Sequence, residues 1–368
     1  AGPTAAASGP AGGPPAAARG ALRSALERLV STAGGPPGAI AVVQRGPARR
    51  VVSAGVVAVG SHRAPQADDH VRIASVSKAL SGAAALALVA RGDLSLGTTV
   101  GQVLPTLPAA WATVTLAELL GHTSGVPDFS ASPAFREALV ASLTTAPPPR
   151  QLLGYVEGES LAFAPGSRYA YSNSDNVIVG LMVQAVTGQP YQAVLAADVE
   201  RPLGLAQTTL PSTVALEAPY LHGYDAGQDG PEDVSEAFTP GWAWASGGVV
   251  STPADANRFV RGYVRGATTD AATRRQQFRF VPHASSEPPG PGANAAGLAI
   301  FRYRTACGTV YGHTGNTAGY TQFVAASADG SRSVSVTVSR QLSPATAPRR
   351  FARLRRVFRL AVCAAMAR

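Results

Sequence analysis

Lysine is almost absent from this sequence, and cysteine is scarce. Of the 31 basic residues, Lys78 is the only lysine and the others are arginines, while two residues are cysteine. No run reaches the roughly 18 uninterrupted apolar residues that a membrane span needs. We therefore expect a soluble protein with no membrane span.

Patterns for metal and phosphate binding are also missing. The histidines outside the segment around His313 show no ligand spacing, so we predict no metal. The glycine clusters are not framed by a strand and a helix in the order that a phosphate-binding loop requires, so we predict no cofactor. His122, in the segment GHTSG, is expected to shape a loop rather than to do chemistry.

The composition is that of a globular protein with an Ala/Val/Leu core, 46% apolar and 14% charged. Residues 1–16 are rich in Ala, Gly and Pro and are predicted to be a disordered lead. The chain begins without methionine and without a basic and apolar signal, which favours a mature secreted protein or a trimmed chain. In a secreted protein two cysteines suggest one bridge, Cys307 to Cys363, and two buried thiols are the alternative.

The formal charge of +9 would suit an anionic partner such as a cell-wall polymer, a membrane surface or a nucleic acid. The basic residues look scattered along the chain, except in residues 349–368. There arginines alternate with apolar residues at helical spacing, which predicts an amphipathic helix with a solvated arginine face. We therefore predict no nucleic-acid partner.

Hydrophobic periodicity divides the chain into sheet and helical parts. A helix is expected at 18–32, a hairpin from 38–46 and 49–60, and a buried helix after Ser75. Helices separated by Pro/Gly loops fill residues 91–238, and alternating strand patterns follow, including WAWASGGVVST at 242–252.

This order predicts an α/β fold of the α+β type, in which an antiparallel sheet is flanked by N- and C-terminal helices. Residues 17–90 and 239–368 would form the sheet region and residues 91–238 an inserted all-helical region. The active site is expected between the two.

Ser75 and Lys78 form the first chemical motif, in the stretch IASVSKAL. Three residues apart on a helix, they lie on one face, so the amine can reach the hydroxyl. Burial would bring the lysine pKa from about 10.4 towards 7 and make the neutral amine a general base, a role closed to arginine. The alternative is a capping serine followed by a lysine that extends to solvent.

Two later clusters supply further polar groups. Tyr171 could relay a proton, and Asn173 could form hydrogen bonds with both Lys78 and a substrate amide. The alternative is a tyrosine in the core beside a helix cap. His313, Thr314 and Gly315 fall in a predicted strand, where Gly315 would let a ligand backbone approach. A lone strand histidine is more often structural.

Together the three motifs SVSK, YSN and HTG resemble the ordered Ser-x-x-Lys, Tyr-x-Asn and (Lys/His)-Thr-Gly elements of the serine β-lactamase and penicillin-binding-protein superfamily. The resemblance covers roughly residues 20 to 365 and includes the paired cysteines. It is greatest to the secreted actinobacterial D-Ala-D-Ala carboxypeptidase/transpeptidase, which also has His in the third motif.

The resemblance implies a role for each motif residue. Ser75 would be the acylated nucleophile, Lys78 its base and Tyr171 the proton shuttle to the leaving amine. Asn173 would orient Lys78 and the substrate, and the backbone amides of Ser75 and Asn316 would form the oxyanion hole. The cleft would be walled by His313, Thr314, Trp242, Phe129 and Phe135.

Two positions depart from the carboxypeptidase pattern. That pattern has a threonine where this chain has Asn316, and an arginine where this chain has Phe301. Arg302 follows one place later, on the opposite face of an ideal strand, and only a bulge would restore it. Both pattern residues hold the substrate carboxylate, so strict carboxypeptidase specificity is in question.

Three hypotheses for function follow. The first is a serine D-Ala-D-Ala carboxypeptidase/transpeptidase, monomeric, that acts on a peptidoglycan-type peptide or another acyl small molecule and binds β-lactam inhibitors. The second has the same catalytic residues but a different acyl donor, as in an esterase, a D-amino-acid amidase or a thioesterase-like cyclase. Phe301 and Asn316 favour this second hypothesis modestly. The third is a penicillin-recognising or wall-binding protein without turnover, but no catalytic element is missing.

Overall fold

The computed structural model describes residues 16–228, 230–282, 284–286 and 294–367. An antiparallel sheet of eight strands in the order β2-β1-β12-β11-β10-β9-β8-β7 organises the fold. The predicted antiparallel sheet with flanking helices is confirmed. The predicted lead lies outside the described residues, except for Ala16, which already begins the first helix. The strands are β1 (Gly38–Arg45), β2 (Ala48–Gly55), β7 (Val281–Pro282), β8 (Asn294–Ala296), β9 (Phe301–Thr305), β10 (Gly308–Thr317), β11 (Tyr320–Ala326) and β12 (Arg332–Val338).

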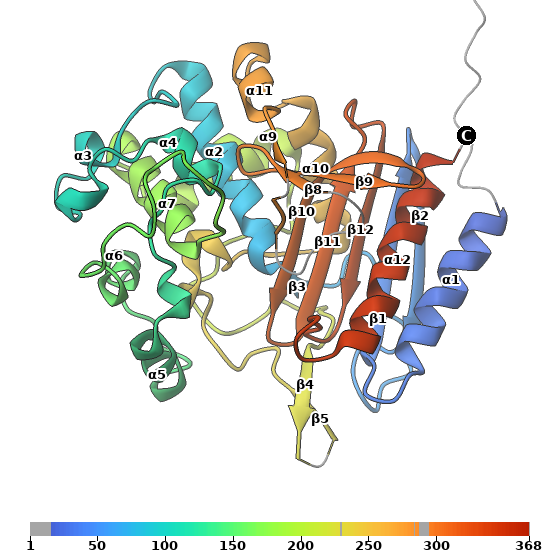
Figure 1. Ribbon diagram of the computed structural model, residues 1–368. Helices are drawn as coiled ribbons and strands as arrows, with labels where there is room; N and C mark the ends of the chain where they lie inside the picture. Colours follow the sequence, from blue (N-terminus) through green and yellow to red (C-terminus); the bar gives the residue numbers. More distant parts are fainter. Residues whose placement is uncertain (1–15, 229, 283, 287–293, 368) are drawn as a thin grey trace, which may run out of the picture.

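Two terminal helices, α1 (Ala16–Val30) and α12 (Pro348–Met366), lie side by side on one face of the sheet (Figure 1). Leu22, Leu26 and Leu29 of α1 recur at helical spacing and are fully buried. Leu354 and Phe358 of α12 are buried in the same core. The polar residues of both helices therefore face outwards.

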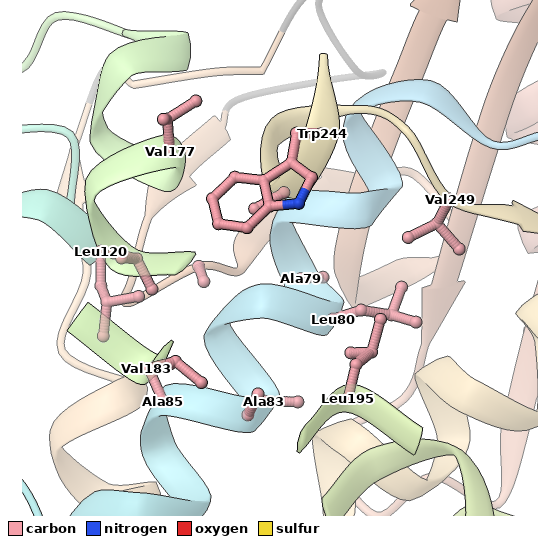
Figure 2. Packing of buried hydrophobic residues seen from close by; sticks show 14 of the residues in the cluster. Ala79, Leu80, Ala83, Ala85, Leu120, Val177, Val183, Leu195, Trp244 and Val249 are labelled. Carbon is pink, nitrogen blue, oxygen red and sulfur yellow. The ribbon is translucent and has the colours of Figure 1, made fainter. Parts of the chain in front are cut away.

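The opposite face of the sheet is covered by α10 (Pro253–Arg265) and by α2 (Ser77–Arg91), which carries the first motif. From Ser77 to Leu88 every residue of α2 is buried. Figure 2 shows Leu80 and Ala83 of α2 packed among side chains from other elements, including Leu195 and Val249. Because α2 is enclosed on all sides, its N-terminal end, where the Ser75 and Lys78 motif lies, is held rigidly.

The named elements within residues 91–238 are helices and 3-10 turns, apart from one hairpin in the segment predicted to be all-helical. A small antiparallel hairpin, β4 (Tyr224–Gly227) with β5 (Gly230–Asp233), projects from this segment (Figure 1). Its central turn contains Gly227, Gln228 and Gly230, and glycine favours such turns. The helices here are α3 (Val100–Val103), α4 (Leu116–Leu120), α5 (Pro133–Ala141), α6 (Pro149–Leu152), α7 (Asn173–Thr187), α8 (Tyr191–Leu195) and α9 (Arg201–Leu203); α11 (Ala271–Gln277) follows α10.

The strand expected at 242–252 is mostly wrong. Two 3-10 turns, η6 (Pro240–Trp242) and η7 (Trp244–Ser246), occupy its first half, and only β6 (Val250–Ser251) is extended. It pairs with β3 (Val71–Arg72), just before the first motif. Trp244 has a positive φ of 41°, which an extended strand does not allow. The segment WAWAS therefore forms turns, and Trp242, Trp244 and Ala245 are buried in the core.

A disulfide joins Cys307, in the turn between β9 and β10, to Cys363 in α12. It ties the C-terminal helix to the part of the sheet that carries the third motif. Within the described ranges no helix is long and apolar enough to cross a membrane, and no group of three His, Cys, Asp or Glu side chains could hold a metal ion.

The contact between α7 and η7 gives a test of how the site is positioned. A Cβ on Gly180 would lie 2.7 Å from Trp244 Cζ3 and 2.8 Å from Ala245 Cβ, so η7 would have to shift. We expect Gly180→Ala to lower the free energy of unfolding by about 1–3 kcal/mol in urea titrations, because of overpacking. It should also slow reaction at Ser75.

Gly154→Ala is the matched control, because a Cβ there meets nothing within 4 Å. It should leave both the unfolding free energy and the reactivity unchanged. Equal effects of the two substitutions would contradict the packing account.

Candidate active site

Ser75 lies on a tight turn between β3 and α2, in the 3-10 turn η1 (Ala74–Val76). Ala74, immediately before it, has a φ of 50°, a conformation that a non-glycine residue adopts only at a cost. The neighbours of Ser75 are buried, whereas Ser75 itself is half-buried. The turn therefore presents one hydroxyl to the outside at the start of a rigid helix.

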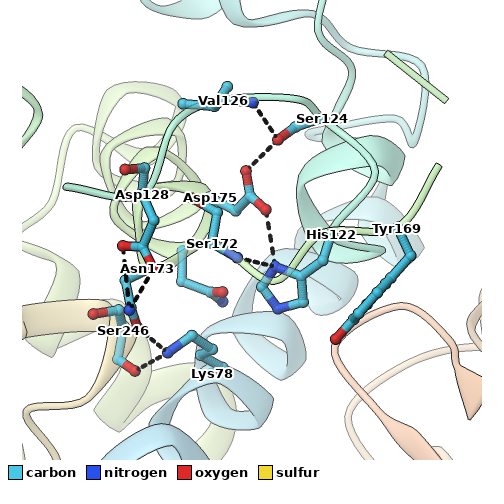
Figure 3. A network of polar contacts seen from close by, with 12 residues as sticks. Lys78, His122, Ser124, Val126, Asp128, Tyr169, Ser172, Asn173, Asp175 and Ser246 are labelled. Atoms are coloured by element: carbon cyan, nitrogen blue, oxygen red, sulfur yellow. Dashed lines mark hydrogen bonds and ion pairs between the residues drawn. The ribbon is translucent and has the colours of Figure 1, made fainter. Parts of the chain in front are cut away.

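Lys78 follows one helical turn later and is fully buried. Its Nζ donates hydrogen bonds to Ser75 Oγ at 3.2 Å, to Asn173 Oδ1 at 2.6 Å and to the backbone carbonyl of Ser246 at 2.7 Å. Figure 3 shows the last two contacts converging on the amine from separate parts of the chain. The solvent-extended alternative for this lysine is thereby wrong.

Burial lowers the pKa of Lys78 to about 7, and the negative charge of Asp128 opposes part of that shift. At neutral pH a large share of the amine is therefore unprotonated. An unprotonated amine 3.2 Å from a serine hydroxyl can accept its proton. Arginine would stay charged in this place.

Asn173 begins α7 and joins Lys78 to a third segment. Its Nδ2 donates to Asp128 Oδ2 at 3.1 Å and to Ser130 Oγ at 2.9 Å, while its Oδ1 accepts from Lys78. Asp128 also accepts from the backbone N–H of Ser130 and so caps a short 3-10 turn, η3 (Phe129–Ala131). Sequence reasoning missed Asp128 and Ser130, although an Asp followed by Ser in a Pro-containing loop is a capping signal.

Tyr171 lies above the lysine. The centre of its ring is 4.9 Å from Lys78 Nζ, and the ring packs against that of His122 with centroids 4.5 Å apart. The structure therefore brings Ser75, Lys78, Tyr171 and Asn173 together, as the sequence predicts.

The Tyr171 ring packs against a histidine that belongs to a buried polar cluster. His122 Nδ1 is 2.8 Å from Asp175 Oδ2, and Ser124 Oγ donates to Asp175 Oδ1 at 2.5 Å (Figure 3). All three side chains are at least 97% buried. The expectation that His122 shapes a loop is incomplete, because its ring is also the surface on which Tyr171 rests.

Burial disfavours a charge on either member of the pair formed by His122 and Asp175. Burial lowers the pKa of His122 to about 3 and raises that of Asp175 well above its ordinary value. The backbone N–H of Ser172 also points at His122 Nδ1, at 3.4 Å, so this nitrogen acts as an acceptor. Burial and this N–H contact therefore favour a protonated Asp175 carboxyl that donates to His122 Nδ1.

β10 packs directly against the turn that carries Ser75. A Cβ on Gly315 would lie 2.3 Å from the carbonyl oxygen of Ile73 and 3.3 Å from Ala74 Cβ. Gly315 is therefore needed for the close approach of the chain's own turn, where the sequence suggested approach of a ligand. The next residue, Asn316, lines the same pocket as Ser75.

His313 and Thr314 are placed differently from the expected cleft wall. Both are fully buried, and neither is among the residues that line the pocket beside Ser75. The Thr314 hydroxyl is 2.5 Å from that of Ser286, and the His313 ring contacts Phe301 and Tyr171. Burial lowers the pKa of His313 to about 3, so it is neutral at pH 7.

Arg302 does not reach the pocket either. β9 keeps a regular register with β10, Phe301 opposite Gly312 and Arg302 opposite Tyr311, so no bulge restores the arginine. Its guanidinium lies 5.0 Å from the centre of the Phe280 ring. Arg302 is accordingly not among the described residues that line the pocket beside Ser75.

A pocket of about 440 Å³ opens at Ser75. As expected, Trp242, Phe129 and Phe135 wall it, and Trp242 is fixed by a hydrogen bond from its Nε1 to the carbonyl of Ser142. None of the described residues that line it is ionisable. Those with large apolar side chains are Phe129, Phe135, Leu139, Leu143, Phe238 and Trp242.

The pKa of Lys78 predicts the pH dependence of acylation at Ser75. Below pH 7 the amine is increasingly protonated, so the acylation rate should fall about tenfold per pH unit, and above pH 7 it should level off. Stopped-flow acylation by a chromogenic ester measures this profile. A rate that keeps rising to pH 10 would contradict it, and Lys78→Arg should lose at least about a hundredfold at every pH.

The protonated state of Asp175 predicts a contrast between two substitutions. Asp175→Asn can still donate to His122 and accept from Ser124, so folding and acylation should change little. Asp175→Ala leaves buried polar groups without a partner and should cost about 1–3 kcal/mol of unfolding free energy. If Asp175→Asn is as damaging as Asp175→Ala in urea titrations, the carboxyl is ionised and this account is wrong.

Known proteins share parts of this sequence. The D-alanyl-D-alanine-carboxypeptidase/endopeptidase AmpH of Escherichia coli is 29% identical over 218 residues, 58% of this chain and 53% of that protein. Penicillin-binding protein 4 of Amycolatopsis lactamdurans is 29% identical over 229 residues, 60% of this chain and 58% of that protein. The chain therefore spans somewhat more than half the length of these curated relatives.

Solved structures share the fold over nearly the whole chain. A D-stereospecific amidohydrolase from Streptomyces sp. is 28% identical with a TM-score of 0.77, covering 87% of this chain and 94% of that one. The D-amino acid amidase of Ochrobactrum anthropi SV3 has a TM-score of 0.79 over 95% of this chain and 97% of its own, at 21% identity, which shows the fold alone. A family model described as Beta-lactamase matches residues 22–357, and the chain therefore belongs to the Beta-lactamase family.

Proposed function

We propose that the protein is a serine amidohydrolase that cleaves short D-amino-acid amides and peptides with an apolar acyl side chain, through an acyl-enzyme on Ser75. The observation that carries the proposal is the contact of a buried, largely neutral Lys78 with Ser75 at the mouth of an uncharged, aromatic pocket. The same serine would be acylated by β-lactams.

The first half of the reaction forms the ester. Lys78 Nζ takes the proton of Ser75 Oγ as the oxygen attacks the substrate carbonyl, and the backbone N–H groups of Ser75 and Asn316 bind the oxygen that becomes negative. The C–N bond then breaks. The leaving amine receives a proton from Lys78, relayed by Tyr171, whose ring lies 4.9 Å from Nζ.

The second half hydrolyses the ester by the reverse proton path. Water gives a proton to the Tyr171 and Lys78 pair as its oxygen attacks the acyl carbon, and Ser75 Oγ leaves with that proton. Asn173, held by Asp128 and Ser130, keeps the Lys78 amine in place in both halves.

The pocket favours an acyl donor without a free carboxylate. A carboxylate that enters an apolar site needs a cation or strong donors there. Arg302 is held against Phe280, His313 is neutral at pH 7, and no described lining residue is charged. The aromatic walls instead match an apolar side chain of the substrate.

The Streptomyces relative is named a D-stereospecific amidohydrolase and is 28% identical, which supports the D-configured donor. The second candidate is the D-Ala-D-Ala carboxypeptidase, placed first by the motifs alone. It is supported by the relatives named as D-alanyl-D-alanine carboxypeptidase and penicillin-binding protein, which match part of the chain. The described residues that line the pocket include no cation, which weighs against it.

The experiment first identifies the nucleophile and then compares a substrate without a carboxylate with one that carries a C-terminal carboxylate. Intact-mass measurement with penicillin should show one adduct in the wild type and none in Ser75→Ala. Turnover of D-phenylalanine amide should then exceed that of a D-Ala-D-Ala peptide by at least about tenfold in kcat/KM, because a buried unpaired carboxylate costs a kcal/mol or more.

Each result separates the candidates. Faster turnover of the D-Ala-D-Ala peptide than of its C-terminal amide would reject the amidohydrolase and favour the carboxypeptidase. An adduct that persists in Ser75→Ala would reject both, because both require acylation of this serine.

A further inference from the structure

The charges of the chain are separated between its two parts. By sequence, residues 91–238 hold 15 acidic and 5 basic residues, whereas the remainder holds 7 acidic and 26 basic residues. The mainly helical segment therefore has a net charge of −10 and the rest a net charge of +19. The sequence singles out residues 349–368 as the one concentration of arginines, and the fold places α1, with three more arginines, beside that helix.

Part of this excess positive charge lies on the outer surface of α1 and α12. These helices contact each other along their length and lie on the face of the sheet opposite to α2 (Figure 1). On α12 five arginines are exposed, namely Arg349, Arg353, Arg355, Arg356 and Arg359. On α1 the exposed charged residues are Arg19, Arg23, Arg28 and Glu27. We call this eight-arginine surface the arginine face.

The arginines of this face are available to a partner. Among the described residues none of the eight forms an ion pair with a carboxylate, and Glu27 is the only acid on either helix. At 1.5 Å of rise per residue, the arginines of α12 from 349 to 359 extend over about 15 Å. Like charges held so close repel one another, and a polyanion would relieve that repulsion.

We propose that the arginine face binds a linear polymer that carries repeated phosphate groups, and thereby docks the enzyme without covering its pocket. Guanidinium groups match phosphate oxygens in a bidentate way. A stripe at i, i+4 and i+7, formed by Arg349, Arg353 and Arg356, presents several such groups in a row along one helix. The turn η1, which carries Ser75, directly precedes α2, and α2 lies on the other side of the sheet.

Two features favour such a polymer over a bilayer or a nucleic acid. Binding to a bilayer usually combines charge with an inserted apolar face, but the large apolar residues of α12, such as Phe351 and Phe358, are buried in the core. None of the described exposed large hydrophobic residues lies on α1 or α12. Recognition of nucleic acid uses exposed aromatic rings for stacking, and this face has none.

The test measures binding of long-chain inorganic polyphosphate by the full chain. Wild type should bind, and the affinity should fall at least about tenfold between roughly 50 and 200 mM salt. Arg353→Gln/Arg356→Gln/Arg359→Gln should weaken binding at least about tenfold at low salt and flatten the salt dependence. The control Arg168→Gln/Arg201→Gln/Arg275→Gln removes the same charge from exposed positions on other elements and should bind within about twofold of wild type.

Thermal unfolding shows whether each variant is folded, so the result does not depend on the proposed enzyme activity. Equal weakening by both triple variants would show that net charge alone acts, and would overturn the face. Tighter binding to single-stranded DNA, or to phosphatidylglycerol vesicles, than to polyphosphate at equal phosphate concentration would overturn the choice of partner.

Discussion

The burial of one amine is the constraint on which the site depends. Lys78 Nζ is enclosed with three hydrogen-bond acceptors, which come from the turn before α2, from the start of α7 and from η7. Desolvation is what lowers its pKa, and it is effective only because α2 is buried on every side. The dense packing around this helix and the reactivity at its N-terminus are thus one property of the fold.

Much of the fold and of the site was predictable from local sequence patterns, but the partners of the motif residues were not. The helix, the hairpin and the terminal helices follow from apolar periodicity, and Ser75, Lys78, Tyr171 and Asn173 follow from motif spacing. The partners Asp128 and Asp175 come from loops and helix starts, where one acidic residue looks like any other cap. Their roles depend on distances between segments about 50 residues apart, which no spacing rule supplies.

Strand packing and register explain the roles of two further residues, Gly315 and Arg302. Gly315 is small because β10 meets the carbonyl of Ile73, a contact between segments far apart in sequence. Arg302 faces away because the register of β9 is regular, which the alternation of side chains predicts and a bulge would have reversed. The regular register leaves Phe301 packed against His313 and Arg302 over the Phe280 ring, and neither residue is among those that line the pocket beside Ser75.

The candidate active site and the arginine face lie in different parts of the fold. The motif residues lie near the N-termini of α2 and α7 and on β10, whereas the arginine face lies on the opposite side of the sheet. The most direct test of the central claim uses the fact that Lys78 is the only lysine. With ¹³Cε-labelled lysine, an NMR titration yields one side-chain signal. The account predicts a midpoint near pH 7. A midpoint near the ordinary lysine value of about 10.4 would contradict it.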